Sequence, residues 1–176
     1  MKLEGATGGN VLNVDVDGRA ETTSVIQNSL GHYTDSGDSW AWSNVTYDPD
    51  ANDTIILIKN THTTKDLYIS QIHFASDTAS QVIVHLTNGA TFTPAGTAIV
   101  GVNLNNNISG TAYATAIGDE TANTQGNIIF HTKVLANVPN QFDMSNAVVL
   151  GTNQSIGVDL VTAATNAYAT IWGYYK

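Results

Sequence analysis

The fold is decided by the stretch 52–74, which reads NDTIILIKN, then THTTKD, then LYISQIHF. Its first run, 54–58, is apolar on both faces, which is typical of a strand covered on both sides. Its last run alternates, with Leu67 and Ile69 on one face and Tyr68 on the other. The polar link between the two runs predicts either a hairpin or a short crossing from one sheet to another.

The remaining chain repeats this pattern of short apolar runs and polar turns. Turn signals return at roughly 8–12-residue spacing, as expected for sandwiches and barrels, and no stretch has the length and period of an ordinary helix. The runs are 40–47, 81–87, 99–104, 111–117, 127–134, 147–150, 156–160 and 167–175, of which the Ala-rich 111–117 is ambiguous. We therefore expect an all-β fold, an antiparallel jelly-roll-like sandwich or barrel, formed by one domain over 29–176.

Length and composition limit the function classes. The 176 residues suit one domain, and the absence of cysteine excludes disulfides and thiolate metal sites. The net charge is −9, and the six basic residues are scattered over the chain. Nucleic-acid binding requires clustered basic residues and anionic membranes attract them, so neither partner is expected. No run approaches the roughly 20 apolar residues of a membrane span.

Residues 1–28 are expected to form a separate arm. The dipeptide Asp17–Gly18 between two β-type runs is a strong signal for a β-hairpin. Its second run is polar, and such a hairpin is only marginally stable alone. We expect the arm to dock on another chain, with Val14, Val16 and Arg19 as candidate interface residues.

Six segments of the chain follow a recognisable order. They are VDVDGR at 14–19, NDTIILIKN at 52–60, DLYI at 66–69, GTAIVGVNLN at 96–105, SIGVDL at 155–160 and the closing GYY at 173–175. This order resembles small structural proteins of tailed bacteriophages. The resemblance is one of strands and turns, and it carries no catalytic motif.

The resemblance implies a role in the virion. Proteins of this kind decorate the head, are commonly jelly-roll-like and are often trimeric. By this likeness we expect a non-enzymatic decoration (cement) protein, made in the host cytoplasm, that binds the major capsid protein on the outer surface of a phage head. The alternatives are a tail-fibre or carbohydrate-binding jelly-roll module for host attachment and, last, a small β-sandwich hydrolase.

An acidic turn offers calcium-type oxygen ligands at Asp48, Asp50, Asn52 and Asp53. A calcium-binding helix–loop–helix motif requires Gly at the sixth position and Glu at the twelfth, which here are Asp53 and Lys59. We interpret the turn as a solvated one built from good turn formers, and expect no metal and no cofactor.

The histidines and serines give no coherent catalytic site. The histidines are His32, His62, His73, His85 and His131, and none of them has the spacing of a zinc site on a helix. The last three lie in strand-like runs, where we expect half-buried or cross-strand roles. No Gly-x-Ser-x-Gly sequence is present. Catalytic residues are therefore not assigned.

The aromatic residues suggest either a core or an interface. Trp40 and Trp42 share a face, as do Tyr168, Trp172 and Tyr174 on the last strand. If the small residues between these last three line the interior, the aromatic face needs burial elsewhere. Three copies of that face around one axis would bury it, so we expect a homotrimer with the final strand near the axis. Core packing and a sugar-stacking platform are the other interpretations.

Overall fold

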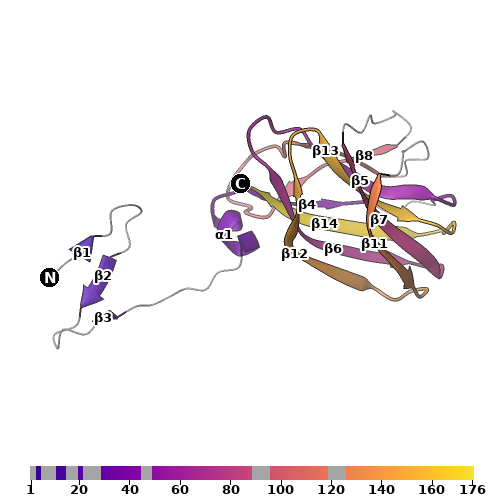
Figure 1. Ribbon diagram of the computed structural model, residues 1–176, viewed down its shortest axis with the longest axis horizontal. Helices are drawn as coiled ribbons and strands as arrows, with labels where there is room; N and C mark the ends of the chain where they lie inside the picture. The colour runs from indigo at the N-terminus through magenta and orange to yellow at the C-terminus, as the bar shows by residue number, and fades with distance from the viewer. Residues whose placement is uncertain are drawn as a thin grey trace.

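Two antiparallel sheets packed face to face form the main body of the protein (Figure 1). The computed structural model describes residues 3–4, 11–14, 20–21, 29–44, 49–88, 96–118 and 126–176. The all-β sandwich expected from the sequence is confirmed. Within the described residues, no helix is long and apolar enough to cross a membrane.

Each sheet combines strands that are distant in sequence. The six-stranded sheet has the order β11 (Asn127–Val134), β7 (Ser80–Asn88), β13 (Gln154–Leu160), β5 (Asp53–Asn60), β10 (Ala114–Gly118) and β8 (Thr97–Ile99). The five-stranded sheet has the order β12 (Asn140–Leu150), β6 (Leu67–Ser76), β14 (Ala167–Tyr175), β4 (Ser39–Ser43) and β9 (Val102–Asn103). Segment 96–118 contributes to both sheets. It supplies β10 and β8, which follow β5 at one edge of the six-stranded sheet, and β9, which follows β4 at one edge of the five-stranded sheet.

The long strands pair in a nested order. β4 pairs with β14, β5 with β13, β6 with β12 and β7 with β11, always antiparallel. β5 and β6 lie in different sheets. The polar link 61–66 is therefore a crossing between the sheets, which answers a question that the sequence left open.

The core lies between the sheets, and β5 is its most buried strand. The four apolar residues Ile55–Ile58 have no exposed surface. Trp40 and Trp42 on β4 are buried in the same core, so of the roles that the sequence allowed them, core packing is the one observed. Burial of such side chains contributes roughly 1.5–3 kcal/mol each.

The last strand, β14, places small residues inside. Ala167, Ala169 and Ile171 belong to the core, while Tyr168 and Trp172 lie on the outward face. Ala and Ile leave room for the large rings of β4 in the shared interior. The aromatic face therefore points away from the core, as the interface hypothesis assumed.

Two segments outside the apolar runs of the sequence form regular structure. The segment 27–39 contains the helix α1 (Ser29–Asp35), which packs on β4 and β14. The predicted run 147–150 is only the end of the eleven-residue strand β12. Its polar residues are tolerated because the register shifts between Asp143 and Val148, where Ser145 has positive φ.

The start of the chain forms a small sheet of its own. β1 (Leu3–Glu4), β2 (Val11–Val14) and β3 (Ala20–Glu21) pair antiparallel in that order. Val14 belongs to β2, whereas Val16, Arg19 and the turn at 17–18 lie outside the described residues. The arm that docks on another chain stays a prediction.

Candidate functional site

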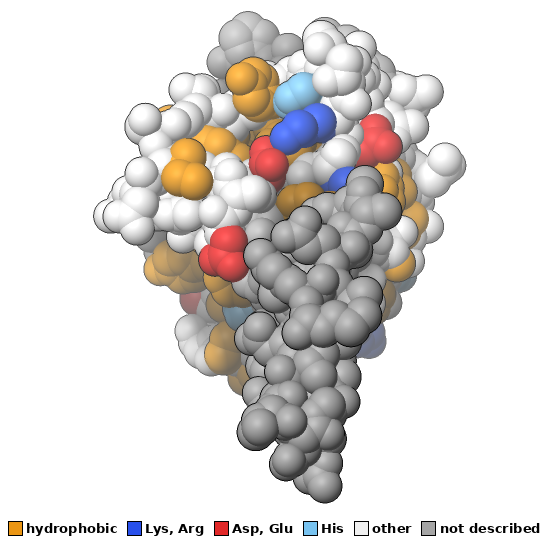
Figure 2. Space-filling model, turned by 90° about the vertical axis from the view of Figure 1, so that its left-hand side faces the viewer, with side chains coloured by type: hydrophobic (Ala, Val, Ile, Leu, Met, Phe, Trp, Pro, Cys, Tyr) orange, Lys and Arg blue, Asp and Glu red, His pale blue; other side chains and the backbone are white. Residues whose placement is uncertain are grey.

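A pocket lies where the crossing 61–66, the segment 103–113 and the end of β14 meet. Its volume is about 150 Å³. Figure 2 views the side of the molecule on which the chain ends, where hydrophobic, basic, acidic and histidine side chains lie near one another. We call this cavity the rim pocket; it is lined by Gly37, Asp38, Trp40, His62, Lys65, Asn103, Ile108, Ser109, Gly110, Thr111, Tyr113 and Tyr175.

The crossing that forms one wall is held by a buried amide. Asn60, at the end of β5, has no exposed surface. Its Nδ2 donates to the carbonyl oxygens of Lys65 at 3.0 Å and Leu150 at 2.8 Å. Its Oδ1 accepts the backbone N–H of His62 at 2.9 Å. These bonds satisfy the amide and fix the turn that presents His62 and Lys65.

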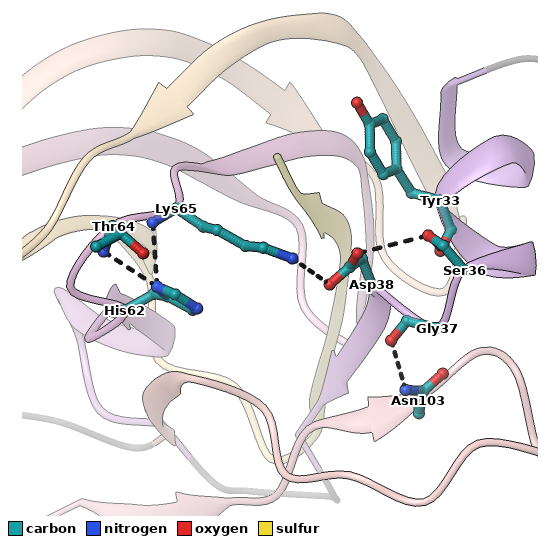
Figure 3. Close-up of polar contacts among 8 residues, drawn as sticks. All are labelled: Tyr33, Ser36, Gly37, Asp38, His62, Thr64, Lys65 and Asn103. Atoms are coloured by element: carbon teal, nitrogen blue, oxygen red, sulfur yellow. Dashed lines mark hydrogen bonds and ion pairs between the residues drawn. The ribbon is translucent and has the colours of Figure 1, made fainter. Parts of the chain in front are cut away.

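The ring of His62 is oriented by the backbone of its own turn (Figure 3). Its Nδ1 accepts the N–H groups of Thr64 at 3.1 Å and Lys65 at 3.0 Å. A nitrogen that accepts two hydrogen bonds carries no proton, so the imidazole is the neutral tautomer with its hydrogen on Nε2. His62 therefore offers one ring N–H as a donor.

An ion pair closes one side of the pocket. Lys65 Nζ lies 2.8 Å from Asp38 Oδ1, and both side chains are partly exposed. An exposed pair of this kind contributes at most about 1 kcal/mol to stability. Its main consequence is positional, since the lysine side chain is drawn across the pocket toward Asp38 (Figure 3).

The opposite wall comes from the segment that carries β9. Asn103 Nδ2 donates to the carbonyl oxygen of Gly37 at 2.8 Å, and its Oδ1 accepts the N–H of Asn105 at 2.8 Å. Gly110 lies against the ring of Trp40, where a Cβ would stand 3.6 Å from Cη2. The wall is thus anchored on the sandwich by a side-chain amide and by ring contact.

Three of the rings that line the rim pocket lie close to one another. The centroid of His62 lies 4.6 Å from that of Tyr113 and 5.7 Å from that of Tyr175. Tyr113 is 60% exposed, whereas Tyr175 is 1% exposed. The buried Tyr175 hydroxyl has no hydrogen-bond partner within the described part of the chain. Burial raises the pKa of Tyr175 above its ordinary value, because it disfavours the phenolate.

The predicted interface residues of β14 do not share one environment. Tyr168 is 47% exposed, and Trp172 packs edge-on against His73 with centroids 4.3 Å apart. Tyr174 is buried, with its ring stacked against Tyr33 of α1 and Tyr68 of β6. Tyr168 and Trp172 thus remain open to a partner, whereas Tyr174 is already covered by its own chain.

A buried polar cluster lies in the six-stranded sheet. His85 Nε2 lies 3.1 Å from Asp159 Oδ1, which also accepts the Thr54 hydroxyl at 2.6 Å. His85 Nδ1 accepts the N–H of Gly126 at 3.2 Å. Since His85 and Asp159 have no exposed surface, a substrate cannot reach them. The cluster joins strands and is a structural feature.

The acidic turn is closed by its own residues. Asp53 is buried, and its Oδ2 accepts the N–H of Asp50 at 2.8 Å. Asn52 has a positive φ of 68°, which suits Asn in a turn. Asp48 lies outside the described residues. In the described ranges, no three His, Asp or Glu side chains gather into a group that could hold a metal ion.

Sequence reasoning did not find the rim pocket. It assigned His62 and Lys65 to a polar link and Tyr175 to the last strand, and it gave Tyr113 no role. A Thr-His-Thr-Thr-Lys link could have drawn attention, but only the fold brings it beside Tyr113 and the chain end. No protein-family model, curated protein or solved structure matches the chain.

Proposed function

We propose that this chain is a non-enzymatic structural protein of a tailed-phage virion, which decorates and stabilises the outer surface of the capsid as a homotrimer. The observation that carries the proposal is the outward aromatic face of β14. Tyr168 and Trp172 lie on the central strand of the five-stranded sheet, where another protein surface can cover them.

The environment of these two side chains suits a protein partner. Tyr and Trp are enriched at interfaces because they combine a large apolar area with a polar group. His73 and Thr170 lie beside them and form a shallow hollow with Tyr168. Within the described residues, α1 packs at the Tyr174 end of the strand and leaves this region open.

A second apolar surface lies along the edge formed by β11 and β12. Ile128 on β11 is 54% exposed, and Leu135 in the connection is 68% exposed. β11 pairs with β7 on one side only. An edge strand with exposed apolar side chains is a ready site for contact with another chain. The edge thus supplies a second contact, which a decorating oligomer requires if it binds both its own copies and a shell.

The nested pairing of the strands supports the architecture that the resemblance implies. The first long strand pairs with the last, and each later strand pairs with the matching one from the end. We infer from this order a jelly roll, with β8, β9 and β10 as additions. Jelly rolls serve many functions, so the architecture agrees with the virion role without selecting it.

A tail-fibre or carbohydrate-binding module is the second candidate. The rim pocket favours it, because aromatic rings stand there beside Asp, Asn, Ser and Thr side chains. The two candidates differ in the surface used: the outward face of β14 for assembly, and the rim pocket for a ligand.

The assembly proposal is tested by co-sedimentation of the full chain with phage heads assembled without it, followed by electron microscopy. We expect saturable binding that the double substitution Tyr168→Ala with Trp172→Ala abolishes. Tyr113→Ala removes an exposed tyrosine elsewhere and serves as the control, with binding retained. Absence of binding to heads, or equal binding by the double variant, would contradict the proposal.

A further inference from the structure

We propose that the edge strand β11 receives the arm of a second copy of this chain, whose residues 12–16 add one further strand beside residues 130–134. The inference goes beyond the assembly proposal, because it gives the exposed edge of the six-stranded sheet one named occupant. It makes no use of the outward face of β14.

The backbone of β11 is open to another strand. β11 ends the six-stranded sheet, and no described strand lies on its outer side. Its register to β7 shifts between Ile128 and Phe130 and is regular from Phe130 to Val134. The N–H and C=O groups along a regular edge are a template for a strand from another chain. Residues 130–134 therefore offer a short, regular ladder to a partner.

One row of side chains on this edge is apolar and incompletely covered. Phe130 and Thr132 lie opposite the core residues Val84 and Val82, so their row faces the interior of the sandwich. The ring of Phe130 contacts that of Phe142, and Phe130 is only partly buried. Apolar side chains in the same row of an added strand would cover it.

The outward row of the same edge carries an uncompensated cation. His131 and Lys133 lie opposite Ile83 and Gln81, on the face away from the core, and both are exposed. His131 Nε2 lies 2.9 Å from Gln81 Oε1, whereas the Lys133 ammonium has no ion pair with any described residue. Complementary charge at this position is a carboxylate on the partner strand.

The arm has the matching sequence. Residues 12–16 read Leu-Asn-Val-Asp-Val, so in an extended strand the three apolar side chains fall on one face and Asn13 and Asp15 on the other. With Asp15 opposite Lys133, the apolar face continues the row of Phe130. Opposite charges directly across two strands stabilise their pairing.

The arm gives up little to make this contact, and it is long enough to reach. Its own sheet joins β1 to β2, and β2 to β3, by two residue pairs each. A sheet this small is marginally stable alone, whereas β11 belongs to a folded sandwich. The segment 17–28 links the added strand to α1 and spans up to roughly 40 Å when extended, enough to reach a neighbouring copy.

Cross-linking tests the contact directly, because the chain contains no cysteine. Full-length Asp15→Cys is mixed with isotope-labelled Lys133→Cys under mild oxidation, and a disulfide that joins a labelled to an unlabelled chain can form only between copies. The control pairs Asp15→Cys with Thr97→Cys, an exposed position on β8 at the opposite edge of the sheet. Mass spectrometry should find several-fold more mixed disulfide at position 133 than at position 97. Equal yields, or no mixed disulfide at position 133, would overturn the proposal.

Charge reversal tests the pairing of Asp15 with Lys133. In the wild type, hydrogen-exchange protection of the amides at 130–134 should grow with protein concentration. Lys133→Glu places two carboxylates opposite each other and should raise the concentration needed for that protection about tenfold. Adding Asp15→Lys restores opposite charges and should restore the protection.

Thermal unfolding checks that the exposed substitutions leave the fold intact. Protection that does not depend on concentration, or a double variant no better than Lys133→Glu, would show that the arm does not dock here. Head binding through Tyr168 and Trp172 is measured separately, so either proposal can fail while the other stands.

Discussion

The imidazole of His85 and the carboxylate of Asp159 lie 3.1 Å apart, and neither side chain has exposed surface. They come from neighbouring strands, β7 and β13, and Thr54 on β5 donates to the same carboxylate oxygen. Because His85 Nδ1 accepts the N–H of Gly126, its Nε2–H is the donor to Asp159. Three adjacent strands are thus joined by side chains as well as by backbone.

Removing this imidazole should destabilise the fold. His85→Ala leaves a buried carboxylate with one donor fewer and opens a cavity, so we expect the free energy of unfolding to fall by about 3 kcal/mol. Urea unfolding followed by tryptophan fluorescence measures the change. His131→Ala, on the exposed side of β11, loses only a bond to Gln81 and should change stability by less than about 0.5 kcal/mol. Equal effects of the two variants would contradict a structural role for the buried pair.

Gly157 is required by the same cluster. A Cβ at this position would stand 2.6 Å from His85 Cε1 and 3.2 Å from Leu57 Cδ1. Gly157→Ala should therefore lower stability by about 1–3 kcal/mol. Gly110→Ala, whose Cβ would stand 3.6 Å from Trp40, is the matched control with a small effect.

A double-mutant cycle can show whether the stability lost in Gly157→Ala comes from the clash with the His85 ring. Adding His85→Ala removes the ring that the new Cβ meets, so the cost of Gly157→Ala should shrink in that background. Strict additivity of the two substitutions in urea unfolding would show that the clash with His85 is not the cause.

The pKa of Tyr175 predicts how stability depends on pH. Burial raises this pKa in the folded state, so the folded protein holds the proton where the unfolded chain, above about pH 10, releases it. The contribution of Tyr175 to the free energy of unfolding is then fully present below about pH 10. It decreases as the pH rises further, by at most about 1.4 kcal/mol per pH unit. Urea midpoints measured from pH 8 to 11 should decline less steeply for Tyr175→Phe than for Tyr168→Phe. Identical slopes would show that Tyr175 titrates alike in both states.

Chelators should leave the fold unchanged. The turn at 50–53 is closed by the bond from the N–H of Asp50 to Asp53 Oδ2, and this bond needs no cation. We expect the same melting temperature with and without EDTA. A fall of more than a few degrees would make the acidic turn a metal site.

Strand β5 was predictable because burial on both faces leaves a continuous apolar run, here Ile55–Ile58. β14 was also predictable from its pattern, because its small and aromatic residues alternate along the strand. By contrast, α1 has seven residues with a glycine among them, too few to show a helical period. Only the end of β12, 147–150, was predicted, because the Asp, Ser and Asn residues before it lie at a register shift where propensity favours turns.

The candidate site residues could be predicted from the sequence only in part. The outward placement of Tyr168 and Trp172 was predictable, because alternation assigns faces within one strand. The rim pocket was not, because Asp38, His62, Tyr113 and Tyr175 come from four distant segments. Tyr174 was grouped with the exposed aromatics because the helix that covers it carries no signal in the sequence.

The central claim is that the outward face of β14 assembles copies of this chain, and light scattering of the full chain at micromolar concentration tests it most directly. The proposal predicts a mass three times that of the 18.6 kDa chain, reduced to smaller species by Trp172→Ala with the fold retained. A wild-type monomer, or a trimer that this substitution leaves intact, would contradict it.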